Sequence, residues 1–86
     1  MTLEFRKKFE IVKSVIDNFK DKAFTIGELY VICDEVSRKH DILLQPEDVI
    51  CIVVDLYDSF DLNKEVSEDN VIRYRNNNLN ATVSGR

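Results

Sequence analysis

The first twenty residues place apolar side chains at helical spacing. Phe5, Phe9, Val12, Ile16 and Phe19 recur at steps of four and three residues, which puts them on one face of an amphipathic helix. We therefore predict a helix over residues 3–20, with Thr2 as its amino-terminal cap. The charged residues between the apolar ones form its solvated side: Arg6, Lys7, Lys8, Glu10, Lys13 and Asp17.

A second helix is predicted from a capping box at residues 25–28. Thr25 and Glu28 have the spacing at which each side chain bonds the backbone N–H of the other residue. Phe24 before the cap and Leu29 inside the helix are spaced as a hydrophobic staple. The helix continues to about Lys39, and its inward positions are Ile26, Leu29, Tyr30, Cys33 and Val36.

The segment PEDVICIVVDLYDSFD, residues 46–61, fits two interpretations. Its β-branched run 49–54 is compatible with a buried strand. Pro46 followed by two acids suits the first turn of a helix, and residues 47–60 projected at the helical period separate into two arcs. We therefore predict a helix and keep the strand as the alternative. The apolar arc contains Val49, Ile50, Ile52, Val53, Val54, Leu56, Tyr57 and Phe60.

The rest of the chain reads as a hairpin and a tail. Residues 62–66 and 71–75 are short strand-like runs separated by the polar loop 67–70. Residues 77–86 are polar and without periodicity, so we predict a flexible tail after a single domain of residues 1–76.

The order of these elements resembles the winged helix-turn-helix superfamily over residues 3–76. The segment 24–39 is similar to its first strand and second helix, 46–60 to its recognition helix and 62–75 to its wing, with 23–25 as a possible third strand. The resemblance implies a helix-rich α+β fold, with a winged-helix-like three-helix core and a C-terminal β-hairpin. The alternatives are a plain three-helix bundle with a loose hairpin, and an α+β domain with 49–54 as its central strand.

The distribution of charged residues along the chain favours some functions over others. The net charge is -4, and residues 46–70 contain eight acids and one base, Lys64. Nucleic-acid binding depends on Lys and Arg at the phosphates, yet the predicted third helix has neither. We therefore expect a small protein-interaction module, a regulator or inhibitor of a larger partner with a basic surface. Its expected contacts are Glu47, Asp48, Asp55 and Asp58, although a charged stripe is often only solvated.

The alternative function is a transcription-type regulator that contacts DNA through the wing and the basic start of the first helix. Tyr74 lies between two arginines and is placed for stacking on a base. This interpretation requires one shared face for Arg6, Lys7, Lys8, Lys13, Arg73, Tyr74 and Arg75. A homodimer formed through surplus apolar surface of the third helix is a further possibility.

Catalysis and cofactors find little support in the sequence. Cys33 and Cys51 lack metal-ligand spacing, and His40 has no candidate partner in sequence. Residues 61–69 alternate like the start of a calcium loop, but Val66 replaces its glycine. We expect no enzymatic activity, no cofactor and no metal. The sequence has no long apolar run, so we expect no membrane segment and a cytoplasmic protein. The content of Lys, Asn and Ile suits a protein from an AT-rich genome, such as that of a phage.

Overall fold

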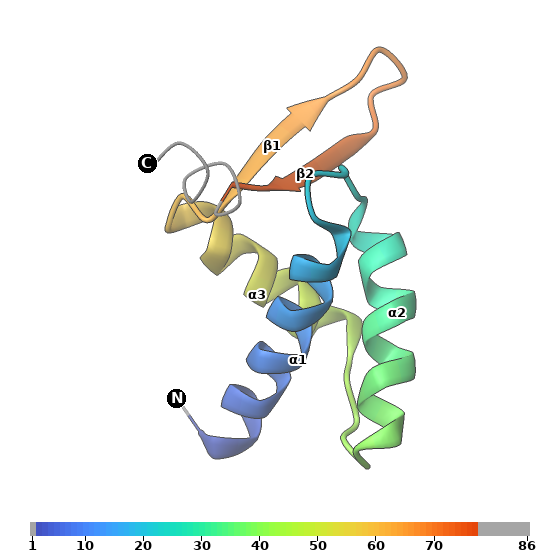
Figure 1. The fold of residues 1–86 in the computed structure, drawn as a ribbon, viewed down its shortest axis with the longest axis vertical. Coiled ribbons are helices and arrows are strands. Elements are labelled where there is room, and N and C mark those ends of the chain that lie inside the picture. Colours follow the sequence, from blue (N-terminus) through green and yellow to red (C-terminus); the bar gives the residue numbers. More distant parts are fainter. Residues whose placement is uncertain (1, 78–86) are drawn as a thin grey trace.

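Three helices are followed by a two-stranded hairpin in the computed structural model, which describes residues 2–77 (Figure 1). The chain therefore has the predicted helix-rich α+β fold, and the run 49–54 is helix rather than strand. The elements are α1 at Leu3–Phe19, α2 at Ile26–Lys39, α3 at Pro46–Asp58, β1 at Leu62–Val66 and β2 at Ile72–Asn76.

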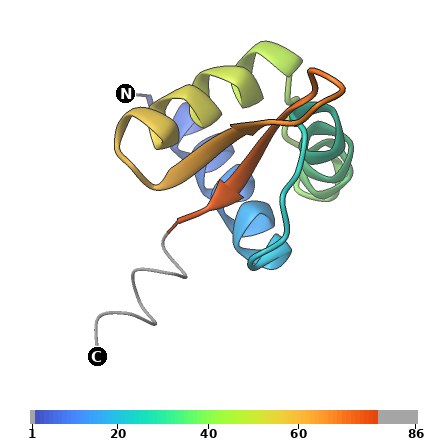
Figure 2. The ribbon, with the colours of Figure 1, turned by 90° about the horizontal axis from the view of Figure 1, so that it is seen from above.

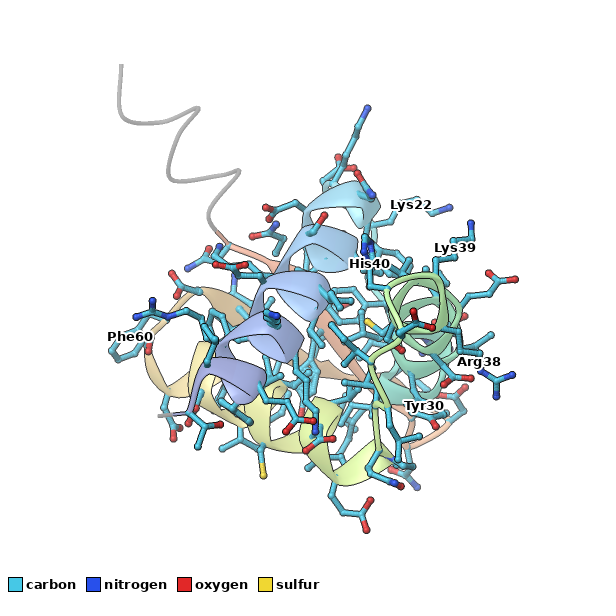
Figure 3. The ribbon with its side chains drawn as sticks, turned by 90° about the horizontal axis from the view of Figure 1, so that it is seen from below. Lys22, Tyr30, Arg38, Lys39, His40 and Phe60 are labelled. Carbon is cyan, nitrogen blue, oxygen red and sulfur yellow. The ribbon has the colours of Figure 1, made fainter. Side chains whose placement is uncertain are left out.

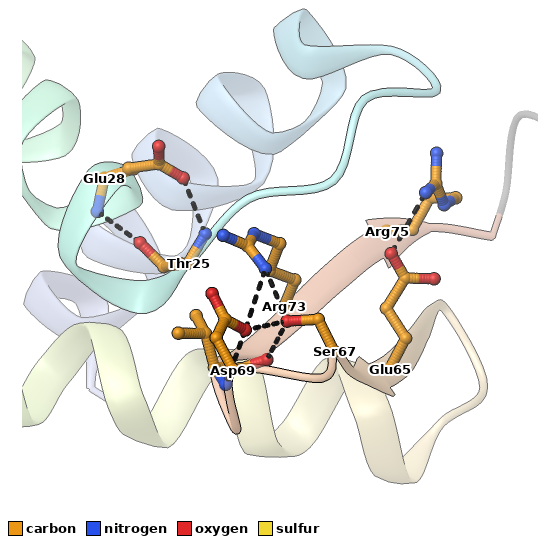
Figure 4. A network of polar contacts seen from close by, with 8 residues as sticks. Thr25, Glu28, Glu65, Ser67, Asp69, Arg73 and Arg75 are labelled. Carbon is orange, nitrogen blue, oxygen red and sulfur yellow. Dashed lines mark hydrogen bonds and ion pairs between the residues drawn. The ribbon is translucent and has the colours of Figure 1, made fainter.

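Side-chain hydrogen bonds cap the amino termini of α1 and α2 at the residues that the sequence predicts. The Thr2 hydroxyl accepts a hydrogen bond from the Phe5 backbone N–H at 3.1 Å. At the start of α2, Thr25 accepts from the Glu28 N–H at 3.1 Å, and the Glu28 carboxylate accepts from the Thr25 N–H at 2.9 Å (Figure 4). These bonds satisfy backbone donors that lack partners inside the helix, so both boundaries are fixed locally.

The core lies where the three helices meet the hairpin. α3 contributes most to it, with four fully or nearly fully buried residues, and Phe24 and Leu29 on either side of the α2 cap are also buried. Burial of these aliphatic and aromatic side chains is the main stabilising contribution in a chain of this size. The buried apolar residues of the helices are Val12, Val15, Ile16, Leu29, Cys33, Val49, Ile52, Val53 and Leu56.

The hairpin is attached to the helices rather than loose. β1 and β2 pair antiparallel, from Leu62 opposite Asn76 to Val66 opposite Ile72. Phe24 forms a bridge with Tyr74, and each backbone N–H donates to the other carbonyl at 2.8 Å. The segment before α2 therefore meets the other edge of β2 at this one residue pair (Figure 2), so the possible third strand at 23–25 is only an isolated bridge.

Several sequence-based boundaries need correction, including the end of the third helix, which lies at Asp58 rather than at residue 60. β2 begins and ends one residue later than predicted, and the first helix ends at Phe19 rather than at residue 20. Asn77, assigned to the flexible tail, is held in place because its backbone N–H donates to the Asp61 carbonyl at 2.9 Å. The remainder of the predicted tail, 78–86, lies outside the described residues.

Candidate protein-interaction surface

α3 has a buried side and an exposed side, and apolar residues occupy both. Ile50, Val54 and Tyr57 follow one another at steps of four and three and are each 40–46% exposed. The wide apolar arc predicted for this helix is therefore not all core, because its edge faces solvent. We define the α3 outer face as the exposed residues Glu47, Ile50, Cys51, Val54, Asp55 and Asp58.

Three of the four predicted acidic contacts lie on this face. Glu47, Asp55 and Asp58 are exposed, and none of them has an ion pair within residues 2–77. No Lys or Arg occurs in α3 to offset their charge. The face therefore combines carboxylates that have no ion pair among the described residues with exposed apolar side chains.

Asp48, the fourth predicted contact, belongs to the packing between helices. Its carboxylate lies 3.0 Å from the Lys8 ammonium, and it also accepts a hydrogen bond from the Gln45 N–H at 2.9 Å. Partial burial raises the pKa of Asp48, but the Gln45 N–H and the Lys8 ammonium lower it by more, so the net pKa is below its ordinary value. Asp48 therefore bonds within the domain, to Lys8 of α1 and to the backbone at the start of α3.

Both arginines of the predicted wing have partners within the domain (Figure 4). Arg73 donates to the Ser67 hydroxyl at 2.8 Å and lies 4.0 Å from the Asp69 carboxylate. Arg75 forms an ion pair with Glu65 at 3.1 Å and donates to the Asp21 carbonyl. The Ser67 hydroxyl, the Val71 N–H and Arg73 hold the pKa of Asp69 below its ordinary value. A phosphate would have to compete with these carboxylates.

The other residues of the predicted nucleic-acid set are Tyr74, within the hairpin, and the cations of α1. The Tyr74 ring is 9% exposed and lies 6.4 Å from both the Phe24 and the Tyr57 ring centroids, so it is core rather than a stacking platform. Arg6 and Lys7 are exposed near the start of α1, at the end of the molecule opposite the hairpin (Figure 1). Lys13 is half-buried farther along α1.

Phe60 is a surface residue, although the helical projection placed it inside. Its ring is 80% exposed and points away from the body of the domain (Figure 3). The Phe60 N–H donates to the Tyr57 carbonyl and the Asp61 N–H to the Leu56 carbonyl, which is the Schellman pattern that ends a helix. Phe60 occupies its left-handed position with φ 65°, where glycine or asparagine is usual. The projection failed because α3 ends at Asp58.

Two asparagines, the last residue of β2 and the one after it, bond to α1 and to the turn after α3. The Asn77 side-chain amide donates to the Phe60 carbonyl at 2.9 Å and accepts from the Asn63 amide at 3.0 Å. Asn76 is buried, and its amide donates to the Asp17 carboxylate at 3.0 Å. The sequence placed Asn77 in a tail and indicated no bonded partner for Asn76, because no local pattern shows partners so far away along the chain.

Of the grooves on the described surface, two are much larger than a third of about 100 Å³ beside Phe19 and Ile32. One, of about 350 Å³, is at the junction of α3 and β1 beside Phe60, and is lined by Tyr57, Asp58, Phe60, Leu62, Asn63 and Lys64. The other, of about 410 Å³, lies between α1 and α2, where Lys7, Glu10 and His40 surround an apolar floor. The mixed charges of the larger groove favour no class of ligand, so we assign it no role.

The cysteines and acids make no metal centre in the described part of the chain. Within residues 2–77 no group of three or more His, Cys, Asp or Glu side chains is arranged to hold a metal ion. Cys33 is buried, and burial raises the pKa of its thiol to about 12, whereas Cys51 is exposed on the α3 outer face. Among these residues there is also no helix of the length and apolar character needed to cross a bilayer.

Comparison with known proteins leaves the function to be argued from this surface. No protein-family model matches the chain, and no significant match was found among curated proteins or among solved structures.

Proposed function

We propose that this chain is a small non-enzymatic protein-interaction module, a regulator or inhibitor that binds a larger partner through the α3 outer face. The observation that carries the proposal is the composition of this face. Glu47, Asp55 and Asp58 border the exposed Val54 and Ile50, and no base lies among them.

The chemistry of the partner follows from that composition. Stable interfaces commonly combine an apolar centre with a polar or charged rim, and complementary charges at the rim speed association and set orientation. Val54 and Ile50 would supply the apolar part of the contact. The three carboxylates would meet Lys or Arg side chains around an apolar patch on the partner.

A winged-helix scaffold is part of the proposal, supported by the order of elements and by the Phe24–Tyr74 bridge. In DNA-binding members of such folds, the third helix enters the major groove. Here that helix would present three carboxylates to the phosphates, and the repulsion would weaken binding. The scaffold is therefore better suited to a protein ligand.

The DNA-binding alternative gains no support from the arrangement of bases. Lys8, Arg73 and Arg75 have carboxylate partners within the domain, and Arg6 and Lys7 lie at the end opposite the wing. Arg6 and Lys7 are therefore separated from Arg73 and Arg75, so these cations do not form one basic face for a duplex.

The proposal is tested by capture of partners from lysate of the source cells, with and without nuclease. The wild-type chain should retain a defined protein after nuclease treatment. The variant Asp55→Lys/Asp58→Lys should retain much less, because it reverses charge at the proposed contact. The matched control Glu10→Lys/Glu35→Lys makes the same change in net charge on α1 and α2, and it should bind as the wild type does.

Other outcomes would reject the proposal in distinct ways. Equal capture by both charge-reversed variants would remove the α3 outer face as the contact. Loss of all specific material on nuclease treatment would identify nucleic acid as the ligand and return attention to Arg73 and Arg75.

A further inference from the structure

The junction of α3 and β1 has a projection and a hollow side by side. Phe60 is 80% exposed and extends from the domain (Figure 3), while the groove of about 350 Å³ beside it is lined in part by Tyr57 and Leu62. An exposed aromatic side chain next to an open, partly apolar groove is typical of a binding surface.

Opposite charges flank the same groove. Asp58 and Lys64 both line it, and neither forms an ion pair within residues 2–77. The Lys64 ammonium lies 4.9 Å from the centroid of the Tyr57 ring, which holds the cation at the rim of the groove. One small surface therefore carries an acid, a base, an aromatic projection and a hollow.

We propose that this corner is a self-association surface whose partner is a second copy of the chain. In a two-fold dimer the same patch meets itself, so a projection must have a hollow beside it and each charge must have its opposite nearby. Phe60 of each copy enters the groove of the other copy, and Asp58 of each copy faces Lys64 of the other copy.

The local backbone holds Phe60 in the position that this contact requires. The Schellman turn fixes its position, and the Asn77 side chain holds its carbonyl at 2.9 Å. A side chain presented by a rigid turn loses little conformational freedom on binding. Because the contact is confined to one corner of a small domain, its area falls at the low end for specific interfaces, and we expect a weak, concentration-dependent dimer.

Analytical ultracentrifugation over a dilution series tests the proposal. The wild-type chain should approach twice the monomer mass at high concentration and return to the monomer mass on dilution. Phe60→Gly should raise the dissociation constant about tenfold or more, as loss of a central aromatic contact does. Glycine suits the left-handed backbone at this position, so circular dichroism should show an intact fold. Leu43→Ser, which changes another exposed apolar residue, should leave the dimer unchanged.

Charge exchange gives a second, independent test. Asp58→Lys and Lys64→Asp should each weaken the dimer, because each places like charges opposite one another. The double variant should restore association by exchanging the charges of the pair. A wild-type chain that stays monomeric at the highest concentration would overturn the proposal. So would a dimer that persists in Phe60→Gly, or a double variant no tighter than the single ones.

Discussion

The Lys8 ammonium and the Asp48 carboxylate lie 3.0 Å apart and join α1 to the first turn of α3. Their side chains are only 15% and 21% exposed, so solvent screens the pair less than it would a surface ion pair. Each residue had been assigned to a different binding hypothesis, Lys8 to nucleic acid and Asp48 to a protein partner. Both belong to the packing between the two helices.

Removing the carboxylate of this pair should destabilise the domain. Asp48→Asn loses the charge that faces Lys8 and weakens the bond to the Gln45 N–H, and we expect a loss of about 1–2 kcal/mol in the free energy of unfolding. Urea denaturation measures the loss. Lys7→Met, a change at an exposed neighbour of Lys8, should change stability by less than about 0.5 kcal/mol. Equal effects of the two variants would show that the pair contributes nothing specific.

Acid should remove the contribution of Asp48. Its pKa in the folded state is lowered from the ordinary 3.8, so above that value the ionised group favours the folded state. As the pH falls through the lowered pKa, the unfolded chain binds a proton more readily than the folded one, and this stability is lost. Urea denaturation at pH 7 and pH 3 should show a larger fall for the wild type than for Asp48→Asn. Parallel falls would place the acid sensitivity elsewhere.

Thiol reactivity should distinguish the two cysteines. Cys51 is exposed on the α3 outer face, whereas Cys33 is buried with a pKa raised to about 12 by burial. A thiol reagent at neutral pH should therefore label Cys51 rapidly and Cys33 only after denaturant is added. Cys51→Ser should abolish the rapid reaction, and Cys33→Ser should preserve it. Rapid labelling of both thiols would contradict the packing of α2 against the core.

Local signals in the sequence predicted the helices and strands well, whereas contacts between residues far apart in the chain could not be predicted from it. The capping box of Thr25 and Glu28 spans three residues, so both partners are visible in one short segment. Lys8 and Asp48 are 40 residues apart, and Asp17 and Asn76 are 59 apart, so their pairing depends on the folded arrangement of the helices and hairpin. Of the candidate site, the acidic character of α3 was predictable, but Phe60 was not.

Asn76 should be more important to stability than its place at the end of β2 indicates. Its buried amide donates to Asp17, so Asn76→Ala removes a hydrogen bond to a charged group. We expect a loss of about 1–3 kcal/mol in the free energy of unfolding, measured by urea denaturation. The control Asn18→Ala changes an exposed asparagine on α1 and should have little effect. A loss no greater than that of the control would mean that water replaces the Asn76 contacts.

Phe60→Gly should stabilise the monomer, although it removes a large apolar side chain. A residue other than glycine costs the folded state about 1–2 kcal/mol in the left-handed region. Glycine also gives the unfolded chain more conformational freedom, which lowers the free energy of unfolding by about 0.4–1 kcal/mol. Because the ring is 80% exposed, little burial is lost, and we expect a net gain of up to about 1 kcal/mol. Urea denaturation at high dilution, where the chain is monomeric, measures it. Asn70→Gly provides the matched control, because Asn70 also has a positive φ, 63°, which asparagine tolerates. A loss of stability in Phe60→Gly would mean that the ring packs against its own domain, and it would count against a role for Phe60 in contacts between molecules.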